Sequence, residues 1–176
     1  INGYNGSIDL NGNVFQVSSG DVDLRDGSID DGTSTSTFLI NTAGASYFRG
    51  VTINTPLSCT SGRIYLNGSI FNQQCTFLKN GAGNDAGTGG NTFNAAVNLS
   101  NSSTGYLMSG NSSADIFNAD LTISNTGSDL IYLAHNSAGN QFNENILIEA
   151  TGSNTGIRFC QGGGSPDATL AATKTL

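Results

Sequence analysis

Short runs of alternating apolar and polar residues recur along the chain at a nearly constant spacing. One template, Phe-Asn-x-x-apolar-x-apolar, occurs at 71-FNQQCTF-77, 93-FNAAVNL-99, 117-FNADLTI-123 and 142-FNENILI-148. Its phenylalanines follow one another after 22, 24 and 25 residues. Apolar residues at alternate positions indicate a β-strand with one buried face. A constant period of this length indicates a repeat protein in which each coil packs on the next.

A divergent copy of the template is expected at 47-YFRGVTI-53, 24 residues before the first. A second short strand recurs between the copies, at 64-IYL-66, 106-YLM-108, 131-IYL-133 and 157-IRF-159. Coils of 22–25 residues are too short for propeller blades of roughly 40–45 residues, and they lack the pattern of leucine-rich repeats. The sequence therefore predicts an all-β fold, a single-stranded parallel β-helix (a β-solenoid) with right-handed winding.

The template also predicts which side chains stack inside the solenoid, because equivalent positions of neighbouring coils lie beside one another. One interior row is expected to contain Val51, Cys75, Val97, Leu121 and Ile146. The next row is expected to contain Ile53, Phe77, Leu99, Ile123 and Ile148, and the third Tyr47, Phe71, Phe93, Phe117 and Phe142. Between the first two rows, the residues expected to point outward are Thr52, Thr76, Asn98, Thr122 and Leu147.

An asparagine directly follows each template phenylalanine, at Asn72, Asn94, Asn118 and Asn143. A side-chain amide both donates and accepts hydrogen bonds, so stacked asparagines can link successive coils. We interpret these four residues as an asparagine ladder. In the divergent copy Phe48 and Arg49 follow Tyr47 and there is no asparagine, so the ladder is expected to start one coil later, at Asn72.

We expect one solenoid domain over 1–176, with irregular coils in 1–45 and regular coils in 46–176. Val22 and Leu24 are expected to be the equivalents of Val51 and Ile53, in one enlarged coil with an insertion near 30-DDGTSTST-37. The segment 80-NGAGNDAGTGG-90 is expected to replace a second strand with a loop. The C-terminal 169-TLAATKTL-176 is typical of a strand that starts another coil. We therefore expect a segment of a longer chain, with neighbouring coils or domains as partners at both ends and a tendency to associate end to end.

Charge and composition narrow the range of functions. Charged residues make up 11% of the chain, against roughly 25% in a typical soluble domain, and the net charge is −7. The six basic residues are scattered, which argues against nucleic acid as a partner. No apolar run approaches the roughly 20 residues of a membrane span. The polar, hydroxyl-rich surface favours an extracellular or cell-surface location. The three cysteines have no metal-type spacing, and Cys75 is expected in the core.

The string 139-GNQFNENILIEATGSNTGIRFCQGGG-164, followed by 169-TLAATKTL-176, resembles repeats of very large exported surface proteins of Bacteroidota-type bacteria, including gliding-type adhesins. The resemblance covers residues 90–176 and rests on the Gly-Asn-x-Phe-Asn and Gly-Gly-Gly…Thr-Leu-Ala-Ala signatures. It implies export, attachment at the cell surface, and adhesion or a structural stalk. It supplies no catalytic residues.

Parallel β-helices also include polysaccharide lyases and glycoside hydrolases, so a carbohydrate-active enzyme is the alternative function. Glycoside hydrolysis needs two carboxylates about 5–10 Å apart. The candidates are Asp115, Asp120, Asp129, Glu144 and Glu149, which form no acidic row on one face and are expected to be solvated turn residues.

Three further patterns are weaker. The acidic stretch 21-DVDLRDGSIDDG-32 hints at Ca²⁺, but Arg25 interrupts the ligand spacing, and Asp21 and Asp23 are expected to be exposed. His135 is the only histidine and is expected in a turn. The outward threonine row suggests an ice-binding face as a minor alternative, although Asn98 and Leu147 interrupt it.

The sequence thus favours a non-enzymatic structural or adhesive module, with no catalytic, cofactor or metal residues. Its outer asparagine, serine and threonine side chains offer hydrogen bonds to cell-surface glycans or to other chains, but no aromatic platform identifies a sugar site.

Overall fold

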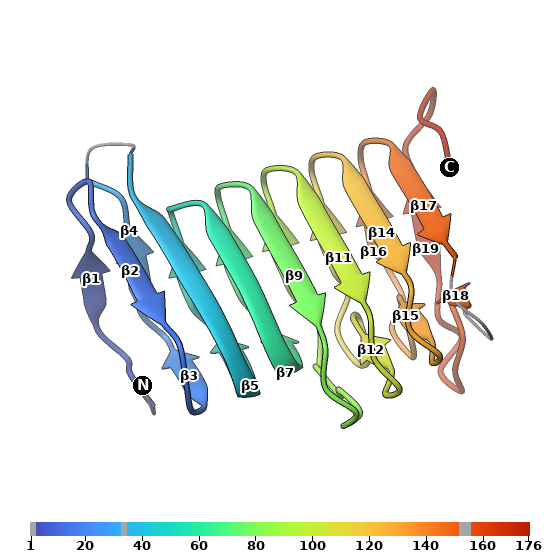
Figure 1. Cartoon of the computed structure of the whole chain (residues 1–176). Coiled ribbons are helices and arrows are strands. Elements are labelled where there is room, and N and C mark those ends of the chain that lie inside the picture. Colours follow the sequence, from blue (N-terminus) through green and yellow to red (C-terminus); the bar gives the residue numbers. More distant parts are fainter. Residues whose placement is uncertain (1–2, 33–34, 152–155) are drawn as a thin grey trace.

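The computed structural model describes residues 3–32, 35–151 and 156–176. Its strands wind into a parallel β-solenoid, as Figure 1 shows. Each strand pairs with its equivalent one coil away, and the described residues contain no helix. They therefore contain no apolar helix long enough to cross a membrane. The predicted all-β solenoid is confirmed.

Three parallel sheets run along the solenoid. The first consists of β1 (Ser7–Asp9), β4 (Ser28–Asp30), β6 (Thr52–Ile53), β8 (Ile70–Phe71), β10 (Thr92–Phe93), β13 (Ile116–Phe117), β16 (Asn140–Phe142) and β19 (Ala168–Leu170). The second consists of β2 (Val14–Val17), β5 (Thr37–Arg49), β7 (Leu57–Asn67), β9 (Cys75–Lys79), β11 (Val97–Asn101), β14 (Leu121–Asn125) and β17 (Ile146–Ala150). The third consists of β12 (Leu107–Met108), β15 (Ile131–Leu133) and β18 (Ile157–Phe159).

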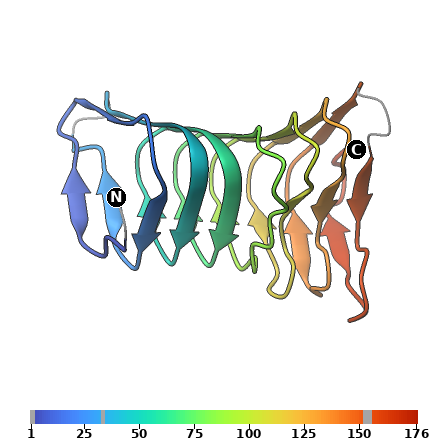
Figure 2. The same cartoon turned by 60° about the horizontal axis from the view of Figure 1, so that its bottom comes forward.

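Strands β5 and β7 are long because each turns a corner and covers two sides of its coil, as Figure 2 shows. Their pairing shifts register between Thr42 and Ala45, where the chain bends. Beyond the bend, β5 pairs with β3 (Val22–Arg25) and β7. Bridges from Asn67 to Gly89 and from Gly89 to Ser113 continue this side toward the third sheet. In the coil between β9 and β10, the glycine-rich segment 80–90 replaces the second strand, as predicted.

A column of aromatic rings fills the interior. Phe71, Phe93, Phe117 and Phe142 are nearly parallel, with centroids 4.7–5.1 Å apart. This spacing follows the distance between neighbouring strands, so each ring packs on its equivalent in the next coil. Val97, Leu121 and Ile146 lie opposite one another in β11, β14 and β17, in a second buried row.

The divergent first copy of the template begins later in the chain than the sequence predicts. Ile53 pairs with Phe71, so it belongs to the phenylalanine row and not to the row of Phe77. Leu57 and Cys59 pair with Cys75 and Phe77, in the positions expected for Val51 and Ile53. The correct copy is 53-INTPLSC-59, which lies closer to 71-FNQQCTF-77 than the regular copies lie to one another. The regular copies, 22–25 residues apart, predict a longer coil here than the 18 residues between Ile53 and Phe71.

The same correction moves two other residues. Tyr47 lies outside the phenylalanine row and pairs with Asp23 and Tyr65. Thr52 lies in β6, in another sheet from Thr76. The outward row of the second sheet instead contains Leu39, Ser58, Thr76, Asn98, Thr122 and Leu147.

The asparagines are joined in a continuous chain of hydrogen bonds from side chain to side chain. Each amide nitrogen donates to the oxygen of the preceding coil, at 2.6 Å from Asn72 to Asn54 and 2.7–2.8 Å from Asn94, Asn118 and Asn143. Asn54 in turn donates to Asp30 at 2.6 Å. The asparagine ladder therefore starts one coil earlier than expected, at Asn54, and Asp30 extends it by a further coil. Arg49 takes no part in it.

The N-terminal coils are more regular than the sequence suggested. Ser7 pairs with Ser28, Val14 with Thr37 and Val22 with Ser46, at separations close to those of the regular coils. The expected equivalence of Val22 and Val51 in one enlarged coil is wrong. A longer coil lies near the C-terminus instead, where Gln141 pairs with Thr169.

Candidate functional site

Asp115, the first carboxylate considered for catalysis, is buried and part of the scaffold. Its side chain is 1% exposed, and Oδ1 accepts hydrogen bonds from the backbone and side-chain nitrogens of Asn91 at 2.9 and 2.8 Å. Ser109 donates its hydroxyl to Oδ2. Burial raises the pKa of Asp115, and these hydrogen bonds oppose the rise. The expectation of a solvated turn carboxylate was wrong here, because Asp115 links two coils from inside.

The other carboxylates are on the surface but serve separate contacts. Asp120 accepts hydrogen bonds from Asn145, Asp129 accepts one from Leu130 N–H, and Glu144 pairs with Lys174. Glu149 is exposed in β17, the last strand of the second sheet. Three surface hollows of the described residues contain at most one carboxylate each. None of these hollows therefore provides the carboxylate pair that glycoside hydrolysis requires.

The acidic stretch at 21–32 is likewise dispersed. Asp23 is 6% exposed, contrary to expectation, because Arg25 donates to both of its oxygens at 2.6–3.1 Å. The hydrogen bond from Arg25 holds the pKa of Asp23 below its ordinary value against the effect of burial, and Arg49 contributes in the same direction. Asp30 belongs to the ladder, and Asp31 accepts the Ser36 N–H at 2.8 Å. No group of three or more potential metal ligands occurs within the described ranges.

The cysteines and the histidine offer no reactive constellation. Cys59, Cys75 and Cys160 are free, and the first two are buried in the core. Burial raises the pKa of the Cys59 thiol to about 12, so it stays protonated at neutral pH. His135 follows β15 and packs against Tyr132 at 4.9 Å between ring centroids, and burial lowers its pKa.

Half-buried tyrosines gather on one side of the solenoid. We call Tyr47, Tyr65, Tyr106 and Tyr132 the tyrosine face. Tyr47 and Tyr65 are opposite each other in β5 and β7 and stack at 4.6 Å with an angle of 7°. Tyr106 and Tyr132 meet edge to face at 5.5 Å. The pairs belong to the same side because Asp85, in the coil after β7, donates its N–H to the Tyr106 carbonyl.

Arginines support the first tyrosine pair. The guanidinium carbon of Arg49 lies 4.4 Å from the centroid of Tyr47. Because Tyr65 covers one face of this ring, Arg49 covers the other. Nε of Arg49 is 3.6 Å from Asp23 Oδ1, which anchors it to the preceding coil. Arg63 is exposed and donates to the Tyr65 hydroxyl at 3.3 Å. Both rings of the first pair are therefore supported by arginine side chains.

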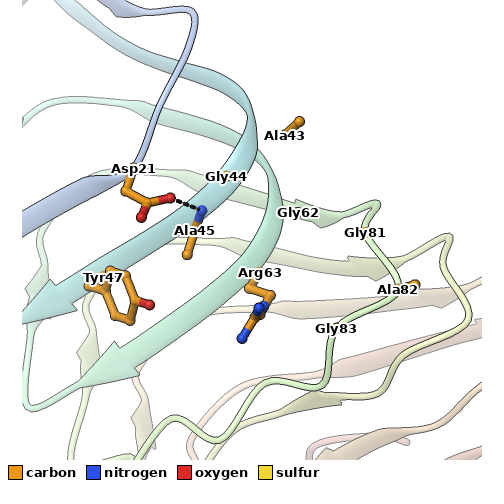
Figure 3. Close-up of a pocket in the computed structure, with 10 residues that line it drawn as sticks. All are labelled: Asp21, Ala43, Gly44, Ala45, Tyr47, Gly62, Arg63, Gly81, Ala82 and Gly83. Carbon is orange, nitrogen blue, oxygen red and sulfur yellow. Dashed lines mark hydrogen bonds between the residues drawn. The ribbon is translucent and has the colours of Figure 1, made fainter.

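A hollow opens beside Tyr47 at the corner where β5 and β7 bend, and Figure 3 shows its lining. We call it the corner pocket. Its volume is about 290 Å³, and it is lined by Asp21, Ala43, Gly44, Ala45, Tyr47, Gly62, Arg63, Gly81, Ala82 and Gly83. Asp21 and Arg63 are its charged residues, and most of the remaining lining is backbone. Such a surface favours a ligand with several hydrogen-bonding groups.

Sequence reasoning missed both features. Tyr65 and Tyr132 occupy the middle of the second-strand motifs 64-IYL-66 and 131-IYL-133, whose outer residues are buried. An aromatic residue between two inward positions must point outward, and this signal was available. The corner pocket had no comparable signal, because its residues come from four successive coils.

The comparisons with known proteins identify no relative. No family model, no curated protein and no solved structure matches this chain.

Proposed function

We propose that this chain is a non-enzymatic structural and adhesive module that acts outside the cell and binds extended glycans along the tyrosine face. One observation carries the proposal: Tyr47, Tyr65, Tyr106 and Tyr132 are half-buried on one side of the solenoid. Tyr47 and Tyr65 stack on each other and so offer ring edges and hydroxyl groups, which can contact the C–H and hydroxyl groups of a sugar.

The scaffold supports a role that depends on fixed geometry. The asparagine ladder and the phenylalanine column link every coil from β6 to β16. Since each coil contacts mainly its neighbours, the solenoid can lengthen without change of cross-section. A linear polymer lying along the axis then meets aromatic side chains from several coils.

Charge supports a neutral glycan over nucleic acid. The chain has a net charge of −7, which repels phosphate polymers. Asp23 pairs with Arg49 as well as with Arg25, and Asp21 lines the same pocket as Arg63. The site that we propose therefore selects by shape and hydrogen bonding, and charge attraction contributes little.

Native electrophoresis of the full chain through gels that contain soluble polysaccharides tests this proposal. We expect at least one neutral polysaccharide from a panel of β-glucan, mannan, xylan and galactan to retard the wild-type protein. Tyr65→Ala should reduce the retardation about fivefold or more, whereas the outward Thr76→Ala on the second sheet should not. If no polysaccharide slows the migration of the protein, the proposed glycan binding is contradicted. If the protein releases new reducing ends from a polysaccharide, the proposal that it is not an enzyme is contradicted.

A further inference from the structure

The corner pocket exists because successive coils approach closely at a corner built from glycine. A Cβ atom on Gly62 would lie 2.2 Å from the Ala43 carbonyl oxygen, and one on Gly81 would lie 2.6 Å from the Gly62 carbonyl oxygen. Real Cβ atoms do not approach backbone atoms so closely, so the fold itself requires these two glycines. Their presence alone says nothing about a ligand.

Gly83 differs from these glycines. The three nearest heavy atoms to a Cβ built on Gly83 all belong to the Arg63 side chain, at 2.5, 2.9 and 3.2 Å. No backbone atom is among them, so coil stacking does not demand glycine here. The absence of a side chain at Gly83 leaves room for the guanidinium of Arg63 in the lining of the corner pocket.

Asp21, the other charged residue of the corner pocket, is also held in place by a hydrogen bond. Asp21 Oδ1 accepts the Ala45 N–H at 2.8 Å, which orients the carboxylate across the bend of β5 (Figure 3). Tyr47 lines the same pocket. Burial raises the pKa of Tyr47, so its hydroxyl stays protonated at neutral pH and can donate. The pocket thus combines a guanidinium donor, a carboxylate acceptor and a phenol that does both.

We propose that the corner pocket binds one neutral sugar unit, whose hydroxyl groups bridge Arg63 and Asp21. One positive and one negative side chain disfavour both anionic and cationic ligands, whereas vicinal hydroxyls can accept from Arg63 and donate to Asp21. The volume of about 290 Å³ is at the lower end of ligand pockets, which suits a single ring and not a chain. This inference rests on the proposed glycan binding and assigns a terminal or branching sugar to the pocket beside Tyr47.

Nuclear magnetic resonance of the ¹⁵N-labelled full chain tests the inference. The probes are methyl β-glucoside, methyl α-mannoside, methyl β-galactoside and N-acetylglucosamine, with methyl β-glucuronide as the anionic comparison. We expect at least one neutral probe to shift the amide signals of Gly44, Gly62 and Gly83 saturably, with a Kd of about 1–10 mM, typical of a small polar ligand.

Two variants and one control sharpen the test. Arg63→Met removes the donor and should weaken binding about tenfold. Gly83→Ala should weaken it about fivefold, because the added methyl group displaces Arg63 although residue 83 itself makes no hydrogen bond to the sugar. Arg158→Met, which removes an exposed arginine of β18, should leave the affinity unchanged. A tighter response to glucuronide than to every neutral probe overturns the inference. The inference is also overturned if polysaccharide still retards the protein while no neutral probe shifts the amide signals of the three glycines. That result would leave the proposed function standing.

Discussion

The side-chain amide of Asn72 donates a hydrogen bond of 2.6 Å to the side-chain oxygen of Asn54, across a coil of only 18 residues. The same bond recurs between coils of 22, 24 and 25 residues. Coil length therefore varies while the position of the asparagine is held. The extra residues of the longer coils are taken up away from this corner, which lies between the first and second sheets.

Removing one asparagine should weaken the solenoid according to its burial. Asn72→Ala breaks the bonds to Asn54 and Asn94 at a half-buried position, and Asn118→Ala breaks equivalent bonds at an exposed one. We expect Asn72→Ala to lower the free energy of unfolding by about 1–3 kcal/mol and Asn118→Ala by less. Urea unfolding followed by circular dichroism measures both, and equal losses would contradict the dependence on burial.

The phenylalanine column should respond to truncation more strongly. Phe93 is fully buried between Phe71 and Phe117, with centroids at 5.0 and 4.7 Å. Phe93→Ala should cost about 3–5 kcal/mol of unfolding free energy, because it removes a ring from a close-packed stack. Phe93→Leu, which keeps most of the volume, should cost less. A loss below about 1 kcal/mol on alanine substitution would show that the column is not a main source of stability.

The glycine corner predicts a contrast between two identical substitutions. Gly62→Ala places a methyl group against the Ala43 carbonyl oxygen and should destabilise the chain by about 1–3 kcal/mol or more. Gly83→Ala meets only the flexible side chain of Arg63 and should cost less than about 1 kcal/mol. Thermal unfolding of the two variants side by side decides the point, and a similar drop in Tm for both would disprove the distinction.

A buried carboxylate should make stability depend on pH. Asp85 is fully buried beside β12, and burial raises its pKa from 3.8 to about 7 against the opposing effect of Lys79. Between pH 4 and 7 the folded chain therefore holds a proton at Asp85 that the unfolded chain releases. The free energy of unfolding contributed by this group falls as pH rises through that window and stays low above it.

Asp85→Asn isolates this contribution from other titrating groups such as His135 and Asp115. The variant should gain stability relative to the wild type on going from pH 5 to pH 8, as measured by the urea midpoint at each pH. A difference between variant and wild type that does not change with pH would mean that Asp85 titrates near its ordinary pKa in the folded chain.

How far the sequence predicted the structure depended on which residues repeat. The phenylalanine, asparagine and apolar positions from 71 to 148 recur in register, so the sequence predicts their rows directly. Ile148 pairs with Ile123 as expected but is 38% exposed and not interior, because β17 is the last strand of its sheet. The copy at 53-INTPLSC-59 has isoleucine for phenylalanine, proline within it and a short coil after it. The spacing of the regular copies therefore favours 47-YFRGVTI-53 in its place.

The tyrosine face and the corner pocket could not be derived in the same way. Tyr47 faces Tyr65 because β5 and β7 bend and pair beyond the bend, in coils whose register was misassigned. Asp23 is buried with a hydrogen bond from Arg25, and Asp115 with hydrogen bonds from Asn91 and Ser109. These three partners follow no repeating pattern in the sequence. Polar networks of this kind are specified by three-dimensional packing and not by a periodic pattern.

Chemical modification of tyrosine tests the central claim most directly. The wild-type chain is acetylated with N-acetylimidazole with and without the polysaccharide that retards it, and each tyrosine is quantified by mass spectrometry. Tyr4, whose hydroxyl bonds to the Ser7 carbonyl near β1, serves as the internal control. We predict that the bound polysaccharide protects Tyr65 and Tyr132 at least threefold and leaves Tyr4 unchanged. Unaltered modification of Tyr65 and Tyr132 while the polysaccharide is bound would contradict the tyrosine face as the binding surface.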